Sequence, residues 1–230
     1  MKHDELRPEI LGIRMISNVS EDLAKALELG PRQKSLGIVT ADTDDVLYTA
    51  LDEATKDADV EVVYAKSMYA GAANASTKLA GEVIGIIGGP SPAEIRSGLN
   101  SIRNFMESGP CFVSANEDDS IVYYAHTVSR TGSYLSKTAG IPEGEALAYL
   151  IAPPLEAVYG LDAAMKAADV TMVAFYGPPS ETNFGGGLLT GSQSACKAAC
   201  SAFAQAVQTV ADYPKDFEEG KRRVKNGIKG

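Results

Sequence analysis

Cysteine is scarce in this sequence. Three residues among 230 are too few for a closed disulfide framework. Cys196 and Cys200 stand four positions apart in a helical run of small residues, and without a nearby histidine they do not complete a four-ligand zinc site. We interpret them as buried thiols in a packed helix. Cys111 and His126 could pair as nucleophile and base, but no residue nearby would orient them. His3 has no metal-ligand spacing either, so no metal site is expected.

An excess of positive charge and long apolar runs are also lacking. The formal net charge is -9 and the sequence pI is about 4.8, which disfavours nucleic acid and anionic membranes as partners. No apolar run reaches the roughly 18 residues of a membrane helix. The charged start, residues 1–5, lacks the apolar region of a signal peptide. We therefore expect a globular protein in the cytosol, one that could favour cationic small molecules.

Motifs for catalysis and for nucleotide binding are missing as well. No H-E-x-x-H, no paired C-x-x-C and no serine, histidine and aspartate set occurs. Residues 81–90 are rich in glycine, but they lack the G-x-G-x-x-G spacing, no lysine follows as in a P-loop, and Pro90 removes a backbone donor. A packed strand explains this segment better. Neither a cofactor nor an enzymatic activity is expected.

What the chain does contain is a long internal repeat. Eight of the thirteen residues in Leu51–Val63 recur in Leu161–Val173, a shift of 110 positions. The same shift superposes Leu79–Gly81 on Leu189–Gly191. A repeat of this length is the size of a domain, so we predict duplication and fusion of one domain.

The hydrophobic pattern predicts the same order of elements in both halves. In the first half we expect strands at 10–16, 35–40, 59–65 and 79–87, and helices at 20–29, at 46–56 and after Ser91. In the second half we expect strands at 120–128, 146–152 and 169–175, and helices at 156–167 and 194–211. Ser91, Pro92 and Glu94 form a strong helix-start signal.

Two long loops occupy the same place in the repeat, Lys66–Thr77 and Tyr176–Gly187. Loops of this length inside compact domains are usually functional or mobile. A symmetric assembly could bring them together at its axis. Exposed loops without a role remain the alternative.

Acidic residues crowd one turn. Asp42, Asp44 and Asp45 directly precede a predicted helix, and Glu82 lies in a strand that could end near them. Such carboxylates could be acid and base catalysts, metal ligands, helix caps or a pocket for an amine. Helix capping explains one aspartate but not three, because like charges this close repel unless a cation or hydrogen-bond donors compensate.

Several segments carry a resemblance to a known family. The Ala-rich helix leading through Lys166-Ala-Ala-Asp-Val170 into a Val-rich strand resembles the signature of bacterial microcompartment (BMC) shell proteins. Two copies in one chain mark the tandem-domain members. The runs that resemble the trimeric members from ethanolamine-utilisation microcompartments are 41–45, 130–135, 152–157 and 178–183.

The resemblance implies a fold and a structural role. The fold would be α/β (α+β), with two tandem circularly permuted BMC domains, each an antiparallel-rich sheet flanked by helices. Their bounds would be 1–112 and 113–214, followed by a C-terminal tail at 215–230. Members form homotrimeric, pseudohexameric tiles that pack with other shell proteins around ethanolamine metabolism in the cytoplasm.

The resemblance also implies two kinds of site. The pore of the tile would be gated by Lys66, Tyr69, Asn183 and Phe184, and would admit metabolites or bulky cofactors such as cobalamin. An acidic pocket that binds ethanolamine would be formed by Asp44, Asp45, Glu82 and Phe112, and its occupancy could regulate pore opening. The alternatives are a stand-alone amine-binding regulatory module and a hydrolase that uses the aspartate cluster.

Overall fold

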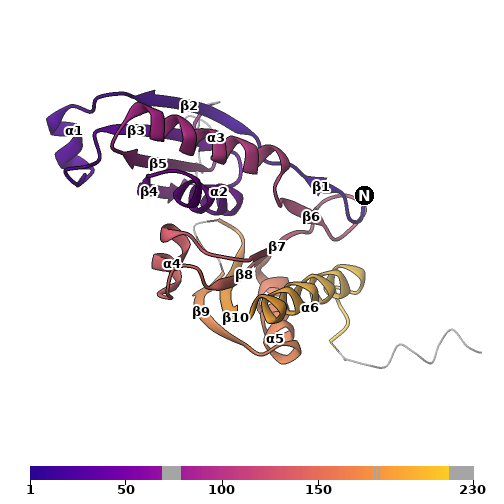
Figure 1. Cartoon of the computed structure of the whole chain (residues 1–230). Helices are drawn as coiled ribbons and strands as arrows, with labels where there is room; N and C mark the ends of the chain where they lie inside the picture. Colours follow the sequence, from indigo (N-terminus) through magenta and orange to yellow (C-terminus); the bar gives the residue numbers. More distant parts are fainter. Residues whose placement is uncertain (69–78, 179, 181, 218–230) are drawn as a thin grey trace, which may run out of the picture.

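The computed structural model describes residues 1–68, 79–178, 180 and 182–217. Two similar halves are stacked on one another (Figure 1). The first half contains β2 (Ile10–Ile16), α1 (Glu21–Ala26), β3 (Ser35–Ala41), α2 (Asp44–Asp57), β4 (Glu61–Ser67), β5 (Val83–Gly89) and α3 (Pro92–Ser108). The second contains β7 (Val122–Val128), α4 (Ser133–Ala139), β8 (Ala146–Ala152), α5 (Pro154–Ala167), β9 (Val170–Tyr176), β10 (Gly185–Gly191) and α6 (Gln193–Asp212). Two short strands, β1 (Glu5–Leu6) and β6 (Phe112–Ser114), complete the described elements.

The two halves share one topology, which confirms the predicted duplication. The first sheet has the strand order β2-β3-β5-β4, and the second contains the corresponding order β7-β8-β10-β9, with all pairs antiparallel. The strands β1 and β6 extend the second sheet beyond β7. The N-terminal strand therefore lies in the sheet of the other half, and the division of the chain at residues 112 and 113 stays a prediction.

The shift of 110 positions holds for only part of each half. It relates α2 to α5, but β5 and β10 are related by 102 positions, because the connection after β4 is longer than the one after β9. Superposing Leu79–Gly81 on Leu189–Gly191 was therefore wrong. The structural counterpart of Gly191, the last residue of β10, is Gly89 at the end of β5.

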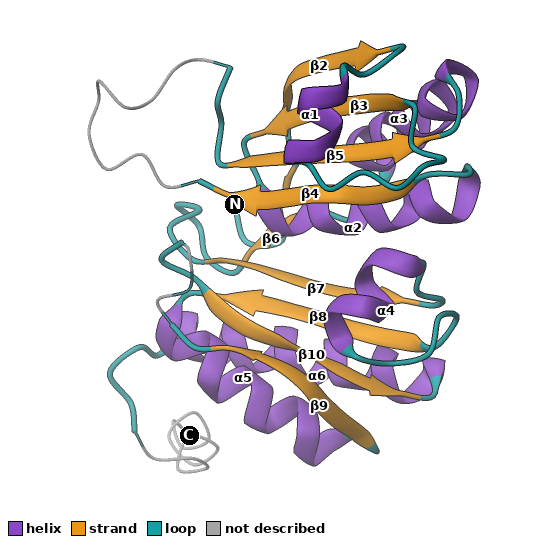
Figure 2. Cartoon of the chain, turned by 90° about the vertical axis from the view of Figure 1, so that its left-hand side faces the viewer, coloured by secondary structure: helices purple, strands orange, loops and turns teal. Residues whose placement is uncertain are grey.

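Sheets and helices alternate in layers. In Figure 2, α1 and α4 lie in front of their sheets, whereas α2, α3, α5 and α6 lie behind them. The apolar face of α2 packs on the first sheet, and its outer face meets the front of the second sheet and α4, so one hydrophobic core spans both halves. A second core fills the space between the second sheet and the helices α5 and α6.

Local sequence patterns correctly predicted the positions of most helices and strands. The strands at 10–16 and 146–152 were predicted to the residue, and the side chain of Ser91 caps α3 by accepting a hydrogen bond from the Glu94 N–H. Within the described residues no helix is long and apolar enough to cross a membrane. All three cysteines are free and buried.

Four predictions about elements were wrong. Helix α2 begins at Asp44 rather than Val46, and β5 begins at Val83 rather than Leu79. Helix α4 was not predicted at all. The second long loop is shorter than expected, because its glycines at 185–187 form the start of β10.

Candidate functional site

The four predicted ligand residues line one pocket between the two halves. This acidic pocket has a volume of about 480 Å³. The first turn of α2 supplies Asp44 and Asp45, the residue before β5 is Glu82, and β6 supplies Phe112. Its described lining residues are Leu6, Arg7, Asp42, Thr43, Asp44, Asp45, Glu82, Phe112, Val122, Thr182, Asn183 and Phe184. Two residues predicted for pore gating, Asn183 and Phe184, thus share the pocket with the ligand candidates.

The three clustered aspartates have different surroundings. Asp42 Oδ1 accepts hydrogen bonds from the Glu9 N–H at 2.8 Å and the Thr43 hydroxyl at 3.0 Å, which ties down the segment before β2. The carboxylate of Asp44 accepts from the Asp45 N–H at 2.9 Å and the Ser67 hydroxyl at 2.8 Å. The helix N-cap is Thr43, whose side chain makes no capping bond, so the interpretation of these aspartates as N-cap residues was wrong.

Asp45 is the buried carboxyl of the pocket. Only 9% of the residue is exposed, and its Oδ1 accepts a hydrogen bond of 2.8 Å from the Tyr149 hydroxyl of the second half. Burial raises the pKa of the Asp45 carboxyl well above its usual range, and the adjacent charge of Asp44 raises it further. Such a carboxyl gains most from a partner that brings a positive charge.

A sharp turn positions Glu82. Gly81 has a φ of +64°, and a Cβ at this position would lie 2.1 Å from the Ala41 carbonyl oxygen. Only glycine fits such a left-handed residue in close contact with the backbone. The Glu82 N–H then donates to the same Ala41 carbonyl at 2.9 Å, which holds the glutamate beside the start of α2.

Aromatic rings connect the pocket to the segment after β9. Phe112 contacts Phe184 edge to face, with ring centroids 5.7 Å apart, and stacks on Tyr124 at 5.5 Å. The Phe184 carbonyl accepts from the Ser180 N–H at 3.1 Å, and the Phe184 N–H donates to the Thr182 hydroxyl at 3.2 Å. Phe184 of this segment therefore forms part of the wall of the pocket.

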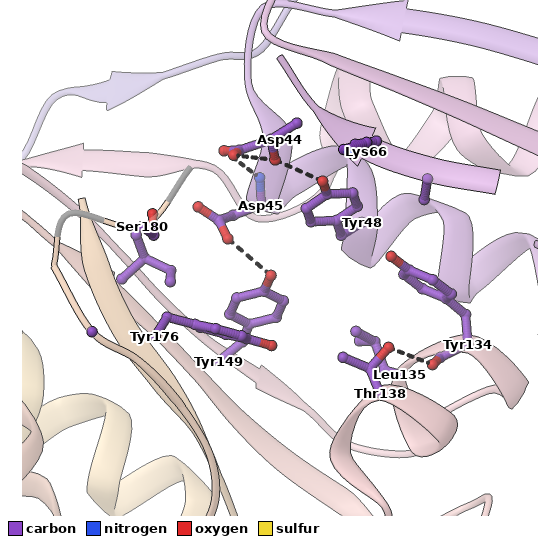
Figure 3. A pocket seen from close by; sticks show the side chains of 14 residues that line it. Asp44, Asp45, Tyr48, Lys66, Tyr134, Leu135, Thr138, Tyr149, Tyr176 and Ser180 are labelled. Atoms are coloured by element: carbon purple, nitrogen blue, oxygen red, sulfur yellow. Dashed lines mark hydrogen bonds between the residues drawn. The ribbon is translucent and has the colours of Figure 1, made fainter. Parts of the chain in front are cut away.

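A second cavity lies on the other side of Asp44 and Asp45. This tyrosine pocket has a volume of about 540 Å³ and includes Lys66 (Figure 3). Its aromatic walls are Tyr48, Tyr134, Tyr149 and Tyr176, which come from α2, α4, β8 and β9. Lys66 therefore lines a different pocket from Asn183 and Phe184, the other described residues predicted for pore gating.

Several lining residues of the acidic pocket, and nearly all of those of the tyrosine pocket, were not predicted from the sequence. Arg7 reaches the acidic pocket because β1 pairs with β6 of the other half, and it pairs there with Glu5 and the Gly109 carbonyl. Such long-range pairing leaves no local signal. Tyr69, predicted to gate the pore, lies outside the described residues. Among those residues, no group of three or more histidine, cysteine or carboxylate side chains is arranged to hold a metal ion.

Comparisons with known proteins agree with this architecture. Residues 35–116 match the BMC domain family. The bacterial microcompartment shell protein EutL of Clostridium perfringens is 73% identical, over 94% of this chain and 100% of the relative. EutL of Salmonella typhimurium is 54% identical, over 92% of this chain and 96% of the relative.

Solved structures give the same result. The crystal structure of the ethanolamine utilization protein EutL from Leptotrichia buccalis has a TM-score of 0.92 and 68% identity, covering 94% of this chain and 100% of that one. The trimeric microcompartment shell protein PduB shares the fold, with a TM-score of 0.70 at 20% identity. The predicted fold of two tandem BMC domains is therefore confirmed. The chain belongs to the EutL family of bacterial microcompartment shell proteins.

Proposed function

We propose that this protein is a homotrimeric tile of an ethanolamine-utilisation microcompartment shell, and that its acidic pocket binds ethanolamine. The printed description of the Leptotrichia relative as an ethanolamine utilization protein supports the metabolic assignment. The observation that carries the ligand assignment is the convergence of Asp44, Asp45, Glu82 and Phe112 on one pocket.

The chemistry of the pocket suits a small hydroxylated ammonium ion. Ethanolamine needs an anionic acceptor for its ammonium group and a polar group for its hydroxyl. Tyr149 already donates to Asp45 Oδ1, so we assign Oδ2 of Asp45, together with Glu82, to the ammonium. Phe112 would supply the wall and the nearby backbone for the rest of the ligand.

The same pocket offers a route from ligand binding to the pore. Asn183 and Phe184 belong to the segment between β9 and β10 and line the pocket. A ligand that contacts this segment favours the conformation in which it binds more tightly, by no more than the difference between its two affinities. Ethanolamine would thereby stabilise one state of a central pore gated by the segments after β4 and β9.

The pore itself would form where three copies meet. Its cargo would be metabolites or bulky cofactors such as cobalamin, and the tile would pack against other shell proteins at its edges. Lys66 at the end of β4 and Phe184 before β10 would stand at the bases of the two gating segments.

Calorimetry with ethanolamine tests the ligand assignment. We expect Asp45→Asn to weaken binding by at least about tenfold, since a charge-assisted contact is lost. Asp169→Asn is the matched control, because Asp169 is exposed and is not among the described lining residues of the pocket. Equal affinities of the wild type and Asp45→Asn would show that the pocket assignment is wrong. The mass of the particle in solution tests the trimeric tile. A mass of 24.2 kDa, that of a single chain, would favour a stand-alone amine-binding module.

A further inference from the structure

The tyrosine pocket is a cavity that the proposed ethanolamine site does not use. Its volume of about 540 Å³ is in the range of small-molecule sites. Elements of both halves supply its walls, namely α2, β4, α4, β8 and β9. The rings that line it are those of Tyr48, Tyr134, Tyr149 and Tyr176. A pocket with this many aromatic side chains recognises a ligand mainly through ring surfaces.

The four rings line one space at different angles. Tyr48 and Tyr134, from α2 and α4, have ring centroids 6.2 Å apart and planes tilted by 46°. Figure 3 shows Tyr149 and Tyr176, from β8 and β9, below Tyr48. Several aromatic rings around one space are the arrangement that recognises quaternary ammonium ions, because the positive charge is attracted to the ring faces.

Two of the rings carry hydroxyl groups without a partner. Those of Tyr134 and Tyr176 make no hydrogen bond with any residue that the structure describes. Burial raises the pKa of Tyr176 to about 12 and also raises the pKa of Tyr134 above its usual range. Both side chains are therefore neutral phenols near neutral pH, and a cation in the pocket meets ring faces rather than a phenolate charge.

The carboxyl groups beside the rings already accept hydrogen bonds. Asp44 accepts from the Asp45 N–H at 2.9 Å with one oxygen and from the Ser67 hydroxyl at 2.8 Å with the other. Asp45 accepts from Tyr149 at 2.8 Å. A primary ammonium group must place three N–H donors on acceptors, whereas a quaternary ammonium has none to place. The pocket therefore favours the quaternary ion, and the charge of Asp44 adds to the attraction.

Lys66 is the cation among the described residues that line the pocket. It is exposed and forms no ion pair with any residue in the described part of the chain. Its ammonium group would repel a ligand that carries positive charge alone, but it can pair with an anionic group on the same ligand. The lining therefore suits a molecule that carries both charges.

We propose that the tyrosine pocket binds a quaternary ammonium compound that also carries an anionic group. The ammonium would lie among the rings of Tyr48, Tyr134 and Tyr176, and the anionic group would pair with Lys66. This site differs in chemistry from the proposed ethanolamine pocket, where carboxylates receive N–H donors. It also stands independently of ethanolamine binding and of the trimer, because its described lining residues all belong to one chain.

Titration calorimetry with three related compounds tests the charges. Glycine betaine joins a trimethylammonium group to a carboxylate, 3,3-dimethylbutanoate has the same shape without the positive charge, and choline lacks the carboxylate. We expect glycine betaine to bind at least about tenfold more tightly than 3,3-dimethylbutanoate, because the latter loses the attraction of a cation to the rings. Equal affinities for these two compounds, or no binding of glycine betaine, would overturn the inference. Choline that binds as tightly as glycine betaine would refute the role of Lys66.

Substitutions of one ring separate its aromatic face from its hydroxyl. Tyr134→Leu should weaken glycine betaine binding about fivefold or more, whereas Tyr134→Phe should stay within about twofold of the wild type, because the hydroxyl has no described partner. Tyr64→Leu is the matched control, since Tyr64 is 42% exposed and is not among the described lining residues. Equal losses in the two Tyr134 variants, or no loss in Tyr134→Leu, would contradict binding to the ring.

Two charged residues complete the test. Lys66→Met should weaken the binding of glycine betaine but not of choline, and Lys34→Met, at an exposed lysine outside the described lining, should change neither. Loss of glycine betaine binding in Glu82→Gln, with full binding in Tyr134→Leu, would place the compound in the acidic pocket and overturn the second site. A protein that binds glycine betaine but not ethanolamine would refute the proposed ethanolamine site alone.

Discussion

Ethanolamine binding should depend on pH through Asp45. The pKa of this carboxyl is raised by burial and by Asp44, so lowering the pH through that pKa populates the neutral acid. An ammonium ligand prefers the carboxylate, and binding must then expel the proton. Below the raised pKa, the affinity should fall about tenfold for each pH unit, with about one proton released per bound ligand; above it, both effects should vanish.

Titration calorimetry at several pH values measures the affinity for ethanolamine. Repeating it in pairs of buffers with different ionisation enthalpies gives the number of protons released per bound ligand. The range must stay below the pKa of the amine of ethanolamine. Asp44, Glu82 and Arg7 also line the pocket, so the same series on Asp45→Asn isolates the contribution of Asp45. We expect the wild type to bind one ligand per chain. An affinity independent of pH, without proton release at any pH, would refute the reasoning.

Raising the pH has opposite effects on ligand binding and on stability: ionisation of Asp45 favours ethanolamine binding but destabilises the folded protein. A carboxyl whose pKa is higher in the folded than in the unfolded protein stabilises the fold at low pH and loses that contribution as the pH rises through the folded-state pKa. The ligand-free Asp45→Asn variant should therefore melt at or above the wild-type temperature near neutral pH. Ethanolamine should raise the melting temperature of the wild type but not that of the variant.

Three further predictions concern the described contacts. Asp52→Ala should lower the free energy of unfolding by about 3 kcal/mol in denaturant titrations at fixed chain concentration, because two buried N–H groups of α4 lose their acceptor; unchanged stability would contradict this. Gly81→Ala should cost more than about 1 kcal/mol and also weaken ethanolamine binding, since it strains the turn that places Glu82. Phe184→Ala should weaken binding about tenfold by removing the ring on Phe112, and full affinity would argue against coupling to this segment.

Elements with strong local signals could be predicted from the sequence. The Ser91 cap is one such signal, and the alternating or continuous apolar pattern of a buried strand is another. Helix α4 lacked a signal because its first N–H groups are satisfied by Asp52, 80 residues earlier in the chain. The start of α2 was misplaced because Asp44 and Asp45 resemble a turn, although negative side chains also suit the first turn of a helix.

The residues of the candidate site likewise divide into those with a local sequence signal and those without one. The crowded turn of Asp42, Asp44 and Asp45 could be singled out because like charges this close call for compensation. The narrower set of Asp44, Asp45, Glu82 and Phe112 was implied by the family resemblance. Arg7 and the walls of the tyrosine pocket could not be predicted, because β1, α4 and β9 reach the site only through pairing and packing between the halves. Residues contributed by one local segment leave a pattern in the sequence, and residues brought together by topology do not.

The departures from the repeat explain why the described residues at the start of α5 do not form an equivalent of the acidic pocket. The positions of Asp44 and Asp45 in α2 are occupied by Pro154 and Leu155 in α5, so the second half has neither carboxylate at its corresponding helix start. The same divergence leaves the start of α5 without the two carboxylates that line the acidic pocket at the start of α2.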